Sequence, residues 1–264
     1  MPARDLALIT DAIRMAGRVA TSFVGNSARR WDKPDGAGPV TEADLAVNEY
    51  LLATLRGARP HYGWLSEETE DTRDRLDKQN VFIVDPIDGT RSFVEGSRTW
   101  AHSVAVAENG IVTAGAIYLP MRDLLYTAAR GHGAWLNGSP LSVSATKGLQ
   151  GAQILATKPV IAPEHWPGGV PAFERSHRPS LAYRLGLVGE GRFDGMLTFR
   201  PTWEWDVAAG VLLIEEAFGK CTTRKGNVLR FNNPVPQLDG LIACGPVVHD
   251  AVMQALGQSG STAT

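Results

Sequence analysis

Two Asn-Gly pairs, at positions 109–110 and 137–138, strongly constrain the fold of the middle of this chain. Each pair separates short runs rich in apolar and β-branched residues, such as HSVAVAE before the first pair and IVTAGAIY after it. Asn-Gly between such runs is typical of a two-residue hairpin turn, because both residues tolerate the positive φ angles that the turn needs. We therefore predict an antiparallel meander from residue 100 to residue 144.

The segment before this meander follows a different period. Residues 5–16 repeat apolar side chains every three or four positions, which predicts an amphipathic helix. A second helix is expected to begin at TEAD, where Thr41 can cap the helix and Asp44 can complete a capping box. Between the two helices, segment 31–39 holds two prolines and two glycines, and we predict a mobile loop there.

Beyond about residue 145 the chain changes to short apolar runs that alternate with helical stretches. This alternation predicts a smaller α/β layer. We therefore expect an α/β protein, of the α+β sandwich type, with two domains. Residues 1–148 would form an α+β domain with a mixed or antiparallel sheet and most of the metal ligands, and residues 149–264 a smaller α/β domain with substrate contacts.

The composition argues against several classes of function. The chain has 264 residues, of which 44% are hydrophobic, and 26 Lys and Arg stand against 28 Asp and Glu. A formal charge of −2 provides no overall field for a nucleic-acid polymer or an anionic membrane. No segment approaches the roughly 18 apolar residues of a membrane span, so we expect no integral membrane contact. Cys221 and Cys244 are expected to be reduced thiols, and the predicted location is cytoplasmic.

The stretch VFIVDPIDGT joins a strand end to two carboxylates. VFIV is predicted to be a buried strand, Pro86 cannot extend a sheet ladder, and Gly89 permits positive φ, so we expect a sharp turn. Asp85 and Asp88 would then lie close together, where each raises the pKa of the other unless a cation lies between them. Mg²⁺ suits such a place, because it prefers carboxylate and carbonyl oxygens.

The neighbouring residues supply what a phosphate group and a metal ion need. The backbone amides of Gly89 and Thr90 would open the next segment, and exposed N–H groups at such a start bind anions. The carbonyl of Ile87 could join the aspartates as a further metal ligand. Two metal ions require more acids, and Glu67 and Asp206 are available.

Each of these further acids also has a simpler explanation. Glu67 opens the charged stretch SEETEDTRDR, and such a run is typical of a solvated surface. Asp206 could cap a helix that begins at Val207, because Asp is a preferred N-cap residue. Asp44 could serve only the cap that begins at Thr41.

Three blocks, GWLSEET, DPIDGTRSF and WEWDVAAG, occur in this order and resemble the signature blocks of the inositol monophosphatase superfamily. PVTEAD and GHGAWLNGSPLSVS resemble further segments of that family, so the resemblance spans most of the chain. It implies a layered αβαβα fold and a homodimer. It also implies Mg²⁺-dependent, lithium-sensitive hydrolysis of a small phosphorylated metabolite by a metal-activated water.

The resemblance further implies a set of metal ligands. A first Mg²⁺ would be held by Glu67, Asp85 and the Ile87 carbonyl, and a second by Asp85, Asp88 and Asp206. A third, looser ion is implied near Glu67. Mn²⁺ could substitute for Mg²⁺, because cellular supply decides between them as much as ligand type.

Three residues are implied in catalysis. Thr90, hydrogen-bonded to Asp44, would orient and deprotonate the attacking water, and Glu67 is catalytic as well as a metal ligand. A helix cap at Asp44 is compatible with this role, because its carboxylate can do both.

The residues just before Trp205-Asp206 indicate which alcohol carries the phosphate. Inositol monophosphatases tend to carry a carboxylate there, whereas no acid lies between Asp194 and Glu204. The block instead resembles the 3'(2'),5'-bisphosphate nucleotidases, often called CysQ, which implies adenosine 3',5'-bisphosphate as the substrate. Phe199 could lie against a base, and Arg200 or Arg184 could bind a second phosphate, because a guanidinium forks onto phosphate oxygens.

Several alternatives stay open beside this interpretation. Inositol monophosphate or histidinol phosphate would undergo the same chemistry. A non-catalytic binding protein on the same fold is a further possibility, although all the acids needed for metal binding are present. A nucleic-acid-binding module lacks the basic bias expected of one. The expected substrate-binding residues are Asp88, Gly89, Thr90, Arg184, Phe199 and Arg200.

Overall fold

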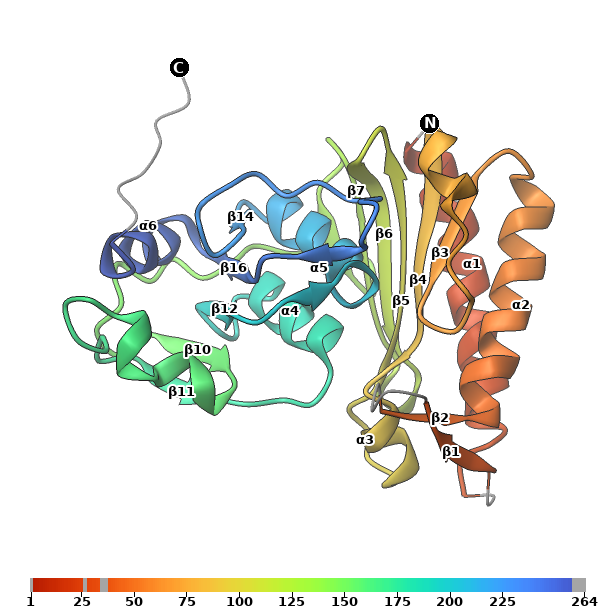
Figure 1. Ribbon diagram of the computed structural model, residues 1–264, viewed down its shortest axis with the longest axis horizontal. Coiled ribbons are helices and arrows are strands. Elements are labelled where there is room, and N and C mark those ends of the chain that lie inside the picture. The colour runs from red at the N-terminus through yellow and green to blue at the C-terminus, as the bar shows by residue number, and fades with distance from the viewer. Residues whose placement is uncertain (1, 26–27, 34–37, 258–264) are drawn as a thin grey trace.

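The structure is a computed structural model that describes residues 2–25, 28–33 and 38–257. Figure 1 shows two β-sheets side by side, each flanked by helices. The N-terminal half contains a seven-stranded sheet, and the C-terminal half contains a five-stranded sheet. None of the helices in the described part of the chain is long and apolar enough to cross a membrane.

The strands of the seven-stranded sheet stand in the order in which they occur in the chain. β3 and β4 are parallel, and all other neighbours are antiparallel. The strands are β3 (Gly63–Ser66), β4 (Asn80–Asp88), β5 (Ala101–Glu108), β6 (Ile111–Leu119), β7 (Leu124–Ala129), β8 (Ala134–Leu136) and β9 (Ser139–Pro140).

Two hairpin turns of this sheet are those predicted from the Asn-Gly pairs. Asn109 and Gly110 join β5 to β6 with φ angles of 50° and 79°, and Asn137 and Gly138 join β8 to β9 with φ angles of 48° and 83°. Positive φ at both turn residues matches the right-handed twist of the flanking strands. The antiparallel meander is therefore confirmed.

Two pairs of helices cover the two faces of the seven-stranded sheet. α1 (Pro2–Thr21) and α2 (Glu42–Ala58) pack on one face (Figure 1). On the other face lie α4 (Leu181–Gly189) and α5 (Glu204–Glu216), and α5 is buried on nearly all sides because it lies between the two sheets. A Cβ at Gly210 would lie 2.3 Å from Leu185, so the close packing of α5 on α4 requires glycine there.

The five-stranded sheet completes a stack of five layers. Its order is β11 (Glu174–Ser176), β10 (Gln153–Ala156), β12 (Gly195–Thr198), β16 (Leu241–Cys244) and β14 (Lys220–Thr222). α6 (Pro246–Ala255) packs on its outer face, so helices and sheets alternate as predicted, in an αβαβα arrangement. Both cysteines are free thiols, as expected. The domain boundary at residue 148 stays a prediction.

Short elements connect these layers. They are β1 (Arg30–Asp32), β2 (Pro39–Thr41), α3 (Thr90–Val94), β13 (Thr202–Trp203), β15 (Gln237–Leu238), and the 3-10 turns Arg73–Asp77, Pro120–Arg122, Lys158–Ile161 and Pro163–His165. β1 pairs antiparallel with β2, so the prediction of a loop over 31–39 is wrong at both ends of that segment. Cross-strand pairing, such as Trp31 opposite Val40, stabilises residues that the local composition assigns to a loop. Residues 34–37 lie outside the described residues.

Candidate active site

The end of β4 places the two aspartates of DPIDGT. The strand continues through this motif to Asp88, so the turn comes later than predicted. A shift of register against β5 between Asp85 and Asp88 forms a bulge, which bends the strand locally. Gly89 then adopts a φ of 93°, as predicted, and Thr90 begins α3. The bulge and the glycine together keep both carboxylates and the Ile87 carbonyl at one end of the sheet.

Asp85 is buried without a full set of partners. It is 1% exposed, and its Oδ1 is a buried atom with no hydrogen-bond partner. Burial, together with the charges of Glu67, Asp88 and Asp206, holds the pKa of Asp85 well above its usual range. A carboxylate in this position is stabilised by a cation, because an unpaired buried charge is costly.

Asp88 joins the two halves of the molecule. Its Oδ2 accepts hydrogen bonds from Ser180 Oγ and from the backbone N–H of Ala182, both at 2.6 Å, at the start of α4. Burial raises the pKa of Asp88 to about 6, although these two hydrogen bonds and the charge of Arg184 oppose the shift. Sequence reasoning missed Ser180 as a partner of Asp88. Ser180 is also the N-cap of α4, where its hydroxyl accepts from the backbone N–H of Tyr183.

Glu67 is not a freely solvated side chain, since it is 24% exposed and paired with Lys33, and its place in the metal site stays a prediction. Lys33 Nζ lies 2.7 Å from Glu67 Oε1 and 2.6 Å from Glu68 Oε1. The Glu68 side chain is almost fully buried, and burial followed by the charge of Glu67 raises its pKa to about 7. The fold brings Lys33 across 34 residues to this acidic pair, which sequence spacing does not reveal.

Asp206 lies in the first turn of α5. The helix begins at Glu204 with Trp203 as its N-cap, so Asp206 is not the cap that the simpler explanation requires. Burial, followed by the charges of Asp88 and Glu67, raises the pKa of Asp206 well above its usual range. The helix dipole favours an acid in this turn, and the neighbouring carboxylates oppose it.

Asp44 and Thr90 are hydrogen-bonded, as the resemblance implies. Thr90 Oγ1 lies 3.1 Å from Asp44 Oδ1 and 3.1 Å from the Ile87 carbonyl oxygen. The other oxygen of Asp44 accepts from the backbone N–H and the hydroxyl of Thr41, which completes the predicted capping box. Burial raises the pKa of Asp44 to about 6. Both roles expected of Asp44 are thus geometrically compatible, and its catalytic role stays a prediction.

The residues predicted to contact substrate are not all gathered at this place. Arg184 is buried, and it donates to the carbonyls of Arg178 and Pro179. Phe199 packs with Trp166 in the core cluster of the C-terminal half, which gives no support to a contact with a base. Arg200 is exposed, and its charge acts on both Arg184 and Asp206.

The oxygen atoms at the end of β4 suit a divalent cation. In residues 2–25, 28–33 and 38–257, no three His, Cys, Asp or Glu side chains already converge at the spacing of metal ligands. One of the candidate acids, Glu67, pairs instead with the ammonium group of Lys33. The oxygen donors nevertheless fit a hard cation, since Asp85 Oδ1 has no other partner and the carboxylates of Asp85, Asp88 and Asp206 raise the pKa values within their cluster.

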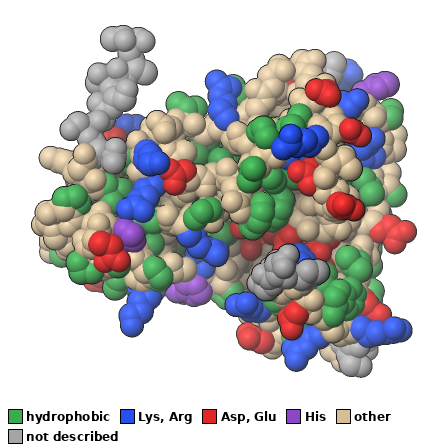
Figure 2. Space-filling model, viewed as in Figure 1, with side chains coloured by type: hydrophobic (Ala, Val, Ile, Leu, Met, Phe, Trp, Pro, Cys, Tyr) green, Lys and Arg blue, Asp and Glu red, His purple; other side chains and the backbone are tan. Residues whose placement is uncertain are grey.

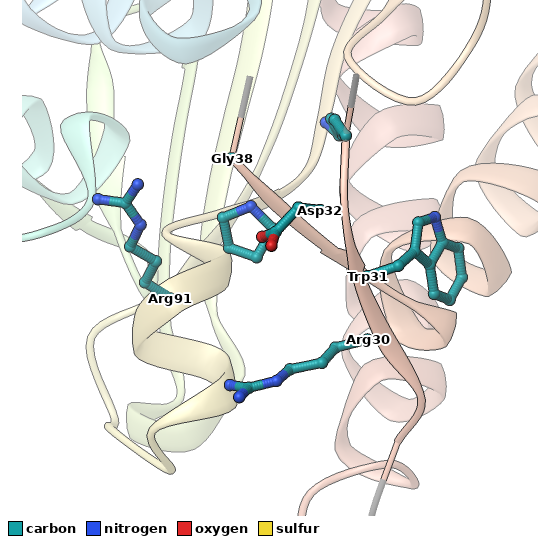
Figure 3. A pocket seen from close by; sticks show the side chains of 7 residues that line it. Arg30, Trp31, Asp32, Gly38 and Arg91 are labelled. Carbon is teal, nitrogen blue, oxygen red and sulfur yellow. The ribbon is translucent and has the colours of Figure 1, made fainter. Parts of the chain in front are cut away.

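Basic side chains surround the approach to these acids. Figure 2 shows a hollow between the two halves of the molecule, with acidic side chains inside it and Lys or Arg side chains along its edge. A cavity of about 590 Å³ near Lys33 is lined by residues of β1, β2 and α3. In Figure 3, Arg30 reaches from β1 toward α3, and Arg91 extends from α3 away from β1. These cations favour the approach of an anion to the end of β4.

Comparison with known proteins gives consistent results. A model of the inositol monophosphatase family matches residues 4–261. An inositol-1-monophosphatase of Rhizobium meliloti is 37% identical over 216 residues, which cover 78% of this chain and 77% of that protein. A Nus factor SuhB of Pseudomonas aeruginosa is 32% identical over 224 residues, which cover 77% and 81% of the two chains. The crystal structure of the extragenic suppressor protein SuhB from Bartonella henselae matches with a TM-score of 0.82 at 30% identity, covering 97% of this chain and 99% of that one.

These relatives bear differently on the resemblance to the superfamily and on the closer resemblance to the bisphosphate nucleotidases. The superfamily and its layered fold are confirmed. The closer likeness to 3'(2'),5'-bisphosphate nucleotidases is not supported, because the relatives named here are an inositol-1-monophosphatase and SuhB proteins. The chain belongs to the inositol monophosphatase family and is a Mg²⁺-dependent phosphatase of that family.

Proposed function

We propose that this phosphatase hydrolyses the monophosphate ester of a small polyol such as inositol. The observation that carries the site assignment is Asp85, a buried carboxylate with one unpartnered oxygen among the charges of Glu67, Asp88 and Asp206. The support for a polyol is the relative of 37% identity that is named an inositol-1-monophosphatase. Histidinol phosphate, a phosphomonoester of an amino alcohol, is an alternative substrate for the same hydrolysis.

In this proposal the metal ions are held by residues from both halves of the molecule. Their ligands are Glu67, Asp85, the Ile87 carbonyl, Asp88 and Asp206. When bound, two or three Mg²⁺ ions, or Mn²⁺ in their place, would neutralise the phosphoryl oxygens and stabilise the leaving alkoxide. The backbone amides of Gly89 and Thr90 would hold the phosphate from the protein side.

Asp44 and Thr90 supply the proton acceptor. Thr90 Oγ1 donates to Asp44 Oδ1, so the lone pairs of the hydroxyl oxygen are free to accept from a water that attacks phosphorus. As that water loses a proton to Thr90, the hydroxyl proton of Thr90 passes to Asp44. The pKa of about 6 for Asp44 suits this task near neutral pH.

A bisphosphate nucleotide is a second candidate substrate. It is favoured by Arg200, which is exposed and close enough to Asp206 to act on its pKa, and by the absence of an acid between Asp194 and Glu204. In this case Arg200 and Arg184 would bind the second phosphate. Phe199 stays a candidate for the base only if its ring leaves the cluster in which it is packed.

Phosphate release from three compounds tests the proposal. We expect Mg²⁺-dependent hydrolysis of myo-inositol 1-phosphate with a higher kcat/KM than for adenosine 3',5'-bisphosphate or histidinol phosphate. A preference for the bisphosphate would favour the second candidate, and Arg200→Ala should then raise its KM. Complete inactivity toward a broad panel of phosphomonoesters would favour the non-catalytic alternative.

Other expectations have separate tests. Lithium inhibition, a homodimer and a cytoplasmic location stay predictions, and the first two can be measured by assay in LiCl and by analytical ultracentrifugation. The name Nus factor, which the P. aeruginosa relative carries, weakens the expectation that nucleic acid is not a partner. A mobility-shift assay with RNA at low and high salt would test that expectation, because contacts to phosphates weaken strongly with salt.

A further inference from the structure

The first residue of α5, Glu204, is completely buried and fully hydrogen-bonded. Its carboxylate accepts from the backbone N–H of Asn232 at 2.6 Å, and from the backbone N–H and side-chain Nδ2 of Asn233 at 2.9 and 2.7 Å. The turn at residues 232–233 therefore wraps around the start of α5.

Arg75 holds the same turn from the N-terminal half. Its Nη1 donates to Asn232 Oδ1 at 2.7 Å, and its Nη2 donates to the carbonyl oxygen of Asn233 at 2.9 Å. In return, Asn232 Nδ2 donates to the Arg75 carbonyl at 3.1 Å. Arg75 is 2% exposed, and two hydrogen bonds to Asp71 fix its guanidinium group.

This network connects segments that carry different metal-ligand candidates. Asp71 and Arg75 follow Glu67 in the connection from β3 to β4, whereas Glu204 lies two residues before Asp206 on α5. Arg75 and Asn232 are separated by 157 residues in the chain. The network thus ties the start of α5 to the edge of the seven-stranded sheet.

We propose that Arg75, Asn232, Asn233 and Glu204 form a clamp that positions Asp206 for metal binding. This inference rests on the proposed function, in which Asp206 is a metal ligand. Glu204 and Asp206 lie in the same first turn of α5, so the bonds that hold Glu204 also fix where the Asp206 carboxylate lies. A buried polar network contributes little stability compared with apolar packing, but its directional bonds fix geometry.

Mg²⁺ affinity, measured by isothermal titration calorimetry without substrate, tests the clamp. In Glu204→Gln an amide group replaces one of the acceptor oxygens, and in Asn232→Gly both side-chain bonds to Arg75 are lost. Glycine suits this position, since Asn232 has a φ of 61°. We expect both folded variants to bind the ion that Asp206 holds about 10- to 100-fold more weakly, as is typical when a partner of a metal ligand is removed.

Asp194→Asn is the matched control. Asp194 is also buried, and it accepts from Ser144, Thr146 and the backbone N–H of Gln153, none of which belongs to α5 or to the clamp. This variant should lose stability comparably and keep wild-type Mg²⁺ affinity. An equal loss of affinity in the control would overturn the clamp, because loosening of the fold in general would then explain the effect.

Asp206→Asn separates the two levels of the proposal. If it binds Mg²⁺ as tightly as the wild type, Asp206 is not a ligand, and both the proposed site and the clamp are overturned. If Asp206→Asn weakens binding but Glu204→Gln and Asn232→Gly do not, the clamp alone is overturned. Circular dichroism of each variant shows which of them are folded at the temperature of titration.

Discussion

A carboxylate is buried at the end of β4 (Asp85) and another at the start of α5 (Glu204), and the two differ in how many hydrogen-bond partners they have. Glu204 has three hydrogen-bond donors at its carboxylate, whereas Asp85 has an oxygen with none. Burial raises the pKa of both acids, but neighbouring carboxylates raise that of Asp85 further, whereas the hydrogen bonds to Glu204 and the charge of Arg75 oppose the shift. The difference teaches how to distinguish the two roles of a buried acid: one with a full set of protein partners maintains the fold, and one without them is held ready for a ligand.

Replacement of Asp85 by asparagine should show the largest effect. We expect kcat to fall by about 10³-fold, because several kcal/mol of transition-state stabilisation are lost with the metal ion. In metal-free buffer with EDTA at alkaline pH, where Asp85 is ionised despite its raised pKa, the free energy of unfolding should nevertheless rise by about 1–3 kcal/mol, because an unpaired buried charge is removed. Phosphate-release kinetics and urea unfolding measure the two quantities. A less stable Asp85→Asn protein in EDTA would contradict the comparison.

Asp44→Asn should have the next largest effect and should depend on pH. We expect kcat to fall by about 10²-fold with the loss of the proton acceptor. In the wild type, kcat/KM should fall as the pH drops below about 6, where Asp44 becomes protonated, and the variant should lack this acid limb. An unchanged acid limb in the variant would assign the titration to another group.

The ionisation of Asp44 should lower the stability of the metal-free protein, whereas it raises kcat/KM. The folded protein keeps a proton on Asp44 up to about pH 6, and the unfolded chain only up to about pH 4. The free energy of unfolding should therefore fall as pH rises from about 4 to about 6, and less steeply in Asp44→Asn. Urea unfolding in EDTA at several pH values measures this difference.

Glu204→Gln should behave as the converse of Asp85→Asn. We expect its free energy of unfolding to fall by about 1–3 kcal/mol, because a buried amide group replaces an acceptor oxygen. Urea unfolding in EDTA measures the change without a contribution from Mg²⁺. A gain in stability would show that the partners of Glu204 do not offset the burial of its charge.

Ser180→Ala should have the smallest effect. Asp88 resembles Glu204 in that its Oδ2 has two hydrogen-bond partners, and it resembles Asp85 in that it lies near another acid, Glu67, whose charge opposes its ionisation. The substitution removes one donor to Asp88 and the N-cap of α4, so we expect a loss of about 1 kcal/mol in stability. Activity should stay within a few-fold, since the Ala182 N–H still holds the carboxylate. A loss as large as that of Asp85→Asn would show that Ser180 contacts the substrate.

The parts of the fold that were predictable depend on neighbours in the chain. The positive φ angles at Asn109 and Gly110, the capping box of Thr41 and the left-handed Gly89 all follow from the preferences of a few adjacent residues. The segment around Trp31 was mispredicted, because its pairing with β2 outweighs a composition that is typical of loops.

The candidate site likewise has parts that local sequence predicts and parts that only tertiary contacts determine. DPIDGT and the acids at 67 and 206 were found because each stands in a recognisable local block, and those blocks also identify the family. The sequence itself therefore establishes a metal-dependent phosphatase with a stack of five layers. The packing of the two halves determines which acids are paired and which stay unpartnered. The contact between Ser180 and Asp88 spans 92 residues, and that between Arg75 and Asn232 spans 157. Such contacts depend on strand order and on the seating of α4 and α5 between two sheets, which no local pattern of residues encodes.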